Sequence, residues 1–198
     1  MGKKGKLITF CGIDGSGKST HISMVYNYLK SINKKVKTTT LVTRNSKFFR
    51  ILEPDLDVFP RQFNCDLIAF QRYMAIETKL KQELKEYDVI LNNRYLYTDW
   101  AYTRGFDKST DLISLLIDKV PTPDVVLLFD IEPEIAMNRI EKRQKEKWEF
   151  QENLRLLTET RNAYLKLAKE RNFKIIDTAS SKEDTFKQSM EYINNILE

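Results

Sequence analysis

The chain has 198 residues, of which 41% are hydrophobic and 31% charged, enough to bury the core of one domain. Its net charge of +5 arises from 33 basic and 28 acidic residues that are interspersed along the chain. This favours a cationic site for phosphorylated small molecules over nucleic-acid binding. No segment approaches the roughly 20 apolar residues of a membrane span. Cys11 and Cys65 form no disulfide framework, so we expect a cytoplasmic protein that binds no membrane.

Short apolar runs alternate with longer amphipathic segments along the chain. The apolar runs are rich in β-branched residues, as strands covered on both faces are. We predict strands at Leu7–Cys11, Val36–Val42, Val89–Asn92, Val125–Phe129 and Phe173–Ile176. We predict helices at Lys18–Ser31, Asp66–Glu86, Thr110–Asp118, Pro133–Gln144, Glu149–Glu170 and Lys182–Leu197. This alternation is typical of a three-layer α/β domain, here over residues 1–198, whose five-stranded parallel sheet carries helices on both faces.

The segment after the first predicted strand matches the phosphate-binding loop G-x-x-x-x-G-K-[ST]. The predicted ATP-binding residues are Gly12, Ile13, Asp14, Gly15, Ser16, Gly17, Lys18, Ser19 and Thr20. In such a loop, backbone N–H groups and the following helix N-terminus bind phosphate oxygens. Lys18 would reach the β- and γ-phosphates of ATP, and the Ser19 hydroxyl would ligate Mg²⁺. The loop therefore predicts a P-loop NTPase fold with ATP as phosphoryl donor and Mg²⁺ as cofactor.

Two further features concern the kind of P-loop protein. The chain contains no N-K-x-D segment, with which GTPases read guanine, so a kinase fits better than a GTPase. The fourth predicted strand is followed by Asp130, which could serve as a Walker-B acid or cap the turn before Pro133. The sequence leaves both interpretations of Asp130 open.

The segment Ile8–Thr20 resembles the opening of thymidylate kinases, which usually read F-E-G-I-D-G-S-G-K-S-T. Three further blocks follow in the order of that family. Thr43-Arg44 stands at its T-R-E-P, Leu67–Arg72 at its L-F-x-A-x-R, and Asn93–Tyr102 at its D-R-Y-x-x-S-x-x-A-Y. The resemblance implies ATP-dependent phosphorylation of a deoxypyrimidine monophosphate, with dTMP as the expected acceptor. It also implies a homodimer packed through helices such as Asp66–Glu86.

The resemblance indicates which residues would bind the monophosphate. Arg72 and Arg94 would hold the acceptor phosphate, and Arg44 would lie near the substrate. A planar, permanently charged guanidinium fixes a phosphate in line for transfer better than Lys does. Asp14 would accept a hydrogen bond from the 3′-hydroxyl of the sugar, and Tyr102 would pack where its bulk excludes a 2′-hydroxyl.

A separate group of residues would contact the base. Thr98 and Asp99 would face its edge. Ile68 occupies the position, four residues before Arg72, at which the family has an aromatic side chain that stacks on thymine. Phe70 lies two residues further on, so on a helix it would point elsewhere. The identity of the base is therefore more open than the reaction.

A basic segment over about residues 137–150 resembles the lid of nucleoside monophosphate kinases. In this family, a catalytic arginine comes either from the phosphate loop or from the lid. Gly15 stands where the first type has Arg, so we expect the lid to supply it. Arg139 and Arg143 are four residues apart on one helical face and could converge on the phosphates, and we favour Arg143. With Lys18 and Arg94, they complete the predicted catalytic set.

Two departures from the family pattern support alternatives. Asn93 replaces the acid of D-R-Y, and Asn45 replaces the glutamate of T-R-E-P. Each change removes a carboxylate that would offset the charge of hydrated Mg²⁺. The chain could therefore be a kinase for another nucleoside or monophosphate, or a nucleotide-binding module with weak or lost catalysis.

Overall fold

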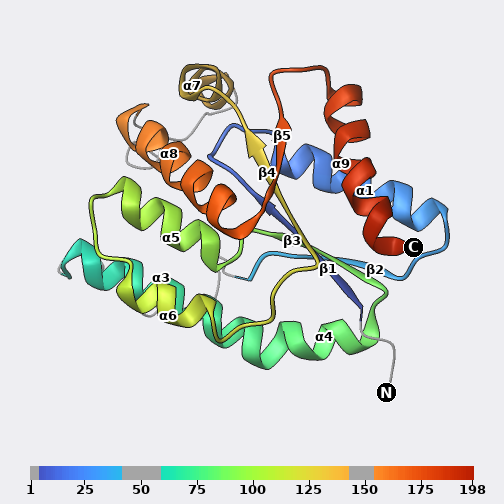
Figure 1. The fold of residues 1–198 in the computed structure, drawn as a ribbon, viewed down its shortest axis with the longest axis horizontal. Coiled ribbons are helices and arrows are strands. Elements are labelled where there is room, and N and C mark those ends of the chain that lie inside the picture. The colour runs from blue at the N-terminus through green and yellow to red at the C-terminus, as the bar shows by residue number, and fades with distance from the viewer. Residues whose placement is uncertain (1–4, 42–58, 143–153) are drawn as a thin grey trace.

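The computed structural model describes residues 5–41, 59–142 and 154–198. Its centre is a parallel sheet whose strands lie in the order β2-β3-β1-β4-β5, which confirms the predicted fold class (Figure 1). The strands are β1 Lys6–Cys11, β2 Val36–Thr39, β3 Val89–Asn93, β4 Val125–Asp130 and β5 Lys174–Asp177. The strand predicted at Val36–Val42 ends earlier, at Thr39, and Val42 lies outside the described residues.

Helices cover both faces of this sheet (Figure 1). Those described are α1 Lys18–Ser31, α3 Arg61–Ala75, η2 Ile76–Leu80, α4 Lys81–Glu86, α5 Leu96–Gly105, α6 Asp111–Ile117, α7 Pro133–Glu141, α8 Leu154–Arg171 and α9 Lys182–Leu197. Helices α1 and α9 pack on one face, and α4, α5 and α8 lie on the other. Among the described residues, none of these helices is both long and apolar enough to cross a membrane.

The sheet separates two hydrophobic cores because neighbouring residues of a strand point to opposite faces. In β1, Ile8 and Phe10 join the core under α1 and α9. Leu7 and Cys11 join the larger core under α4, α5 and α8. A strand buried on both faces reads as a continuous apolar run, which explains why these strands were predictable from sequence.

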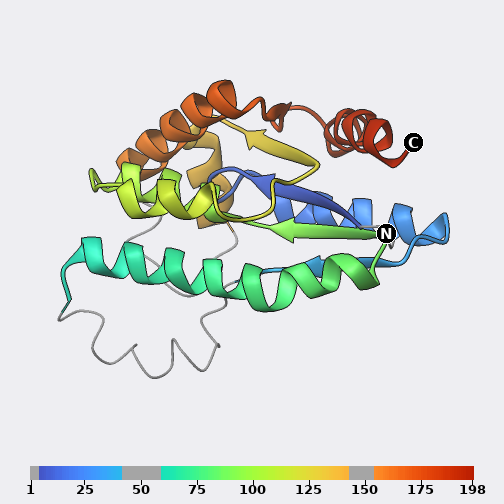
Figure 2. The same cartoon turned by 60° about the horizontal axis from the view of Figure 1, so that its bottom comes forward.

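The helix predicted at Asp66–Glu86 begins earlier, at Arg61. Pro60 stands at its N-cap, where the missing N–H of proline breaks no helical hydrogen bond. α3 continues through one π-helical turn, η2, into α4, so the three segments form one long helical path (Figure 2). This path carries Ile68 and Arg72 in its first part.

Helix α5 was absent from the predicted elements, although it carries Thr98, Asp99 and Tyr102. Eight of its ten residues are buried, so the segment shows no contrast between an apolar and a polar face. It also contains several aromatic and threonine residues, which favour strands more than helices. Packing against α8 and α3, and not local preference, therefore determines this helix.

Candidate active site

The phosphate-binding loop fits tightly between β4 and α7. Gly12, Gly15 and Gly17 have φ angles of 137°, 81° and 89°, in the left-handed region that favours glycine. A Cβ on Gly12 would lie 2.4 Å from the carbonyl oxygen of Phe129, and one on Gly15 would lie 2.5 Å from that of Ala136. The loop therefore approaches β4 closely at Gly12, a glycine that the motif requires, and α7 closely at Gly15, which stands at a variable position of the motif.

Lys18 is the first residue of α1, and its side chain folds back over the loop. Its Nζ donates hydrogen bonds to the carbonyl oxygens of Gly12 at 2.9 Å and Ile13 at 2.7 Å, and to Ser16 Oγ at 3.2 Å. Lys18 is buried, whereas Ser19 and Thr20 are exposed in the first turn of α1. The Lys18 ammonium group thus lies against the loop backbone, and the hydroxyls of Ser19 and Thr20 lie at the exposed rim of the loop.

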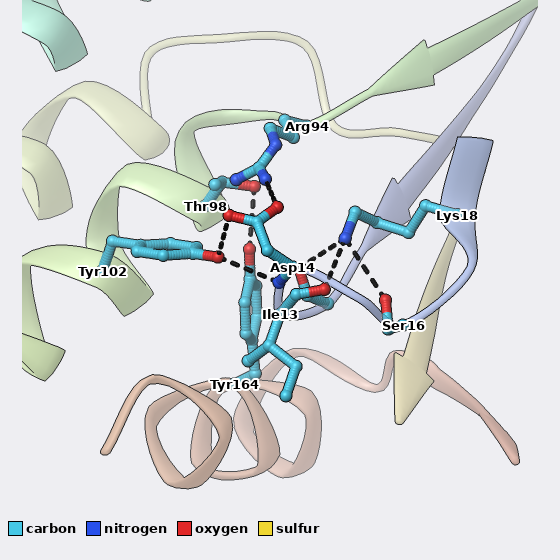
Figure 3. A network of polar contacts seen from close by, with 9 residues as sticks. Ile13, Asp14, Ser16, Lys18, Arg94, Thr98, Tyr102 and Tyr164 are labelled. Atoms are coloured by element: carbon cyan, nitrogen blue, oxygen red, sulfur yellow. Dashed lines mark hydrogen bonds and ion pairs between the residues drawn. The ribbon is translucent and has the colours of Figure 1, made fainter. Parts of the chain in front are cut away.

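Asp14 links the loop to the segment after β3 (Figure 3). One carboxylate oxygen forms an ion pair with Arg94, and the other accepts a hydrogen bond from the Tyr102 hydroxyl at 3.0 Å. The Asp14 backbone N–H also donates to the Tyr102 oxygen at 3.1 Å. Arg94 has a φ of 73°, and its guanidinium lies 5.4 Å from the centre of the Tyr102 ring. Two predicted acceptor residues therefore contact the loop directly.

Both members of this ion pair remain charged near neutral pH. Burial alone would raise the pKa of the Asp14 carboxyl, but Arg94, Lys18 and the Tyr102 hydroxyl outweigh it and hold the pKa below its usual value. Burial likewise opposes the charge on Arg94, but the adjacent Asp14 outweighs it and raises the arginine pKa. A charged, hydrogen-bonded pair consequently lies between the loop and α5.

Arg72 and Asp99 form a second, more deeply buried pair. Arg72 Nε donates to Asp99 Oδ2 at 2.6 Å, and the Arg72 terminal nitrogen donates to Oδ1 at 3.1 Å. The residues are only 4% and 7% exposed. Burial raises the pKa of the Asp99 carboxyl, and Arg72 opposes this rise. The family resemblance implied that Arg72 holds the phosphate and Asp99 faces the base; in the structure the two side chains form one hydrogen-bonded pair.

A cavity brings together the predicted acceptor residues that the structure describes, except Asp14, which contacts two of the lining residues, Arg94 and Tyr102. Its lining comprises Cys65, Ile68, Arg72, Arg94, Thr98, Asp99, Tyr102, Thr103 and Phe106. Phe70 is 47% exposed, which agrees with the expectation that it points elsewhere. Sequence reasoning missed Cys65, Thr103 and Phe106. Thr103 lies one turn after Asp99 on α5, so recognition of that helix would have identified it.

A second cavity lies on the other side of the loop, lined by Gly17, Thr20, His21, Arg139, Thr178, Ser180, Lys182 and Thr185. Arg139 donates to the carbonyl oxygen of Thr178 at 2.9 Å and to that of Gly15 at 3.5 Å. Its guanidinium therefore lies beside the phosphate-binding loop. Arg143 and Arg44 lie outside the described residues, as does most of the predicted lid.

Comparison with known proteins agrees with this arrangement. The family model for thymidylate kinase matches residues 10–189. The chain belongs to the thymidylate kinase family. A protein named "Thymidylate kinase" from Thermosipho africanus is 32% identical over 203 residues, covering 96% of this chain and 98% of that protein. "Probable thymidylate kinase 1" from Saccharolobus solfataricus is 30% identical over 192 residues, covering 97% and 98%. The resemblance noted in the motifs is thus confirmed over nearly the whole chain.

Within this member of the thymidylate kinase family, Asp130 is bound by an arginine. Arg161 of α8 donates from Nε to Asp130 Oδ1 at 2.8 Å and from a terminal nitrogen to Oδ2 at 3.0 Å. Its other terminal nitrogen donates to Glu132 at 2.6 Å. The Asp130 carboxylate thereby joins β4 to α8, a role that neither sequence interpretation of this residue included.

Proposed function

We propose that this protein transfers the γ-phosphoryl group of ATP to dTMP and yields ADP and dTDP. One observation carries the proposal: Asp14 places the phosphate-binding loop, with Lys18, in direct contact with Arg94 and Tyr102 of the acceptor cavity. Donor and acceptor phosphates would therefore meet at one point. Membership of the thymidylate kinase family and the names of its relatives support dTMP as the acceptor.

On the donor side, the loop binds the phosphates of ATP through its backbone N–H groups and the N-terminus of α1. Lys18 supplies positive charge where negative charge develops during transfer. Arg139 borders the second cavity, and its hydrogen bonds to Gly15 and Thr178 favour a role in holding the nucleotide. The contribution of Arg143 to transfer stays a prediction.

On the acceptor side, Arg94 binds the phosphate of the monophosphate, and the Asp14 carboxylate accepts a hydrogen bond from the 3′-hydroxyl of the sugar. Tyr102 packs where a 2′-hydroxyl would lie. The Arg72–Asp99 pair presents N–H donors beside a carboxylate acceptor at the cavity wall. Thymine offers the matching edge, a carbonyl oxygen next to an N–H, whereas cytosine reverses this order. Arg72 therefore contributes to base binding in this proposal, and not to phosphate binding.

Mg²⁺ is compatible with the residues present. Within the described ranges, no group of three or more His, Cys, Asp or Glu side chains could hold a metal. Mg²⁺ commonly keeps several waters and binds mainly through substrate phosphates, so such a cluster is unnecessary. Ser19 at the rim of the loop would hold it, and the buried, unpartnered Oδ1 of Asn93 could accept a hydrogen bond from a metal-bound water. The ion would neutralise charge on the β- and γ-phosphates.

Single-turnover transfer from labelled ATP tests the proposal across dTMP, dUMP, dCMP, dGMP and thymidine. We expect transfer to dTMP to be fastest, and transfer to dCMP and thymidine to be slow. Lys18→Ala should reduce the rate by about 100-fold or more with an unchanged circular dichroism spectrum. Faster transfer to thymidine than to dTMP would indicate a nucleoside kinase. Retained ATP binding without any transfer would indicate a nucleotide-binding module.

The proposal includes a homodimer formed through α3. Phe63, Phe70 and Met74 are 46%, 47% and 43% exposed. They recur at spacings of seven and four residues, which places them on one face of the helix. Large apolar side chains gathered on one exposed face are typical of a contact surface. A cytoplasmic location stays a prediction.

A further inference from the structure

Tyr164 of α8 is a buried residue to which the proposed function assigns no role. It is only 1% exposed, and its ring belongs to the larger hydrophobic core. Its hydroxyl donates a hydrogen bond to Thr98 Oγ1 at 2.9 Å, and Thr98 is only 3% exposed (Figure 3). Burial raises the pKa of Tyr164 well above its usual value, so the phenol remains a neutral donor. This bond therefore connects two helices in a dry environment, where loss of a partner is costly.

The helix that receives this bond, α5, supplies Thr98, Asp99, Tyr102 and Thr103 to the lining of the acceptor cavity. Thr98 lies in the first turn of α5, four residues after Arg94 and four before Tyr102. The N-cap residue of α5, Tyr95, makes no capping bond through its side chain. The Tyr164 hydroxyl therefore tethers a helix start that lacks this common stabilisation.

The same two helices also approach closely at the other end of α5. A Cβ on Gly105 would lie 2.3 Å from Thr160 Oγ1 of α8, so a larger residue there would displace the Thr160 side chain. Figure 1 shows α5 and α8 side by side. The two helices thus meet at Gly105 near the end of α5 and at the Tyr164–Thr98 bond in its first turn.

We infer that Tyr164 is a positioning residue for acceptor binding, acting through Thr98 to hold α5 so that Arg94, Asp99 and Tyr102 face the monophosphate. The inference rests on the proposed function. The loop contacts α5 through Asp14, but among the described residues the second cavity, on the donor side, is lined by Gly17, α1, α7, α9 and the turn after β5 and not by α5. Loss of the hydroxyl should therefore weaken binding of the monophosphate and leave binding of ATP nearly unchanged.

Tyr164→Phe removes the hydroxyl and keeps the ring, and Tyr95→Phe provides a matched control. Tyr95 is also fully buried, and its hydroxyl donates to the carbonyl oxygen of Pro121 at 2.7 Å, outside the lining of the acceptor cavity. Both variants lose one buried hydrogen bond, so both should lose similar stability. Only Tyr164→Phe should raise the KM for dTMP, by about three- to tenfold, while the KM for ATP changes less than about twofold.

A double-mutant cycle with Thr98→Val identifies the bond that is responsible. The double variant should show nearly the same KM for dTMP as the more affected single variant, because both changes break one interaction. An unchanged KM for dTMP in Tyr164→Phe would overturn the inference, as would equal changes in the KM values for dTMP and ATP. If the wild-type protein transfers phosphate to dTMP, these results refute the inference alone. If it binds no monophosphate, the proposed function fails and the inference falls with it.

Discussion

Asp14 combines two properties that are usually carried by different residues. Its backbone belongs to the phosphate-binding loop, whereas its carboxylate binds Arg94 and Tyr102 on the acceptor side. Because these contacts lower its pKa in the folded protein, the carboxylate stabilises the fold at every pH at which it is ionised. This stabilisation is present above the pKa of an unfolded aspartate, about 3.9, and is lost as the pH falls through the folded value.

Replacing Asp14 with Asn should therefore have a pH-dependent effect on stability. At pH 7, Asp14→Asn should lower the free energy of unfolding by about 1–3 kcal/mol, because Arg94 loses its charged partner. Below about pH 4, the difference between variant and wild type should shrink, because the unfolded wild-type chain takes up a proton at Asp14 before the folded protein does. Urea unfolding at pH 7, 5 and 3 measures this difference.

Asp118→Asn provides a control, because that carboxylate is 67% exposed and should contribute little at any of these pH values. A difference between Asp14→Asn and wild type that stays constant from pH 7 to pH 3 would contradict the assignment of the Asp14–Arg94 pair.

At the scale of single residues, the sequence predicted the phosphate-binding loop, whose residues are consecutive. It did not predict ion pairs between residues that lie far apart in the chain. The loop glycines and Lys18 follow from one continuous motif with a known backbone geometry. Helical spacing correctly separated Ile68 from Phe70. The Arg72–Asp99 pair joins two helices across 27 residues of chain, and α5 was not among the predicted elements. Without that helix, no spacing argument could bring these two side chains together.

Among the elements, α8 is held to the sheet by Arg161 as well as by its apolar face. Arg161 binds Asp130 at the end of β4 and Glu132 at the N-cap of α7. The carbonyl oxygen of Asp130 also accepts hydrogen bonds from Thr178 N at 3.0 Å and Oγ1 at 2.8 Å. Thr178 directly follows β5, so these bonds bring in a further strand. Four elements, β4, β5, α7 and α8, therefore meet at the carboxyl end of β4.

Arg161→Ala should destabilise the protein more than removal of an ordinary surface arginine. Its guanidinium is 22% exposed and satisfies both oxygens of Asp130, so its loss should cost about 1–3 kcal/mol in urea unfolding. Arg171→Ala is the matched control on the same helix, because it breaks one hydrogen-bonded ion pair to exposed Asp118 and a cation–π contact with Tyr97. That change should cost less than about 1 kcal/mol. Equal losses in the two variants would contradict a structural role for the Arg161 bonds.

The elements that the sequence predicted share a visible pattern, and the missed one lacks it. β1 and β4 are continuous apolar runs, and α1 and α9 each have one apolar face. α5 is surrounded by other helices and the sheet, so its burial extends around the helix. The information that makes it helical lies in its partners, α3 and α8, and is absent from its own ten residues.

For the whole molecule, alternation of strands and helices predicted a parallel sheet but not its strand order. The order β2-β3-β1-β4-β5 places β1 centrally, so the loop after it adjoins both β3 and β4. β2 and β3 lie on one side of β1 and β4 and β5 on the other, so the strand order switches at β1, and ligands of open α/β sheets bind at such a switch point. Arg94 after β3 and Asp130 at the end of β4 therefore flank the loop without being near it in sequence.

The proposed homodimer makes a prediction at this scale. A variant with Phe70→Glu and Met74→Glu should elute as a monomer of about half the wild-type mass in size-exclusion chromatography with light scattering, because buried charges at the contact would oppose association. Ile32→Glu is the control, since Ile32 is similarly exposed at 44% but follows α1 on the other face of the sheet. A wild-type monomer would refute the dimer, and a persistent dimer in the double variant would place the contact elsewhere.

Different helices line the acceptor cavity and the second cavity, and this separation bears on how such an enzyme could be redesigned. The wall of the acceptor cavity comes mainly from α3 and α5, whereas the second cavity is lined from α1, α7 and the segment between β5 and α9. Among the described residues, Asp14 joins the two sides, because it belongs to the phosphate-binding loop and binds Arg94 and Tyr102. An engineer could therefore exchange side chains on α3 and α5 for a new acceptor while keeping the donor machinery intact. Asp14 could not be exchanged in this way, because a change there would affect the phosphate-binding loop and the acceptor residues together.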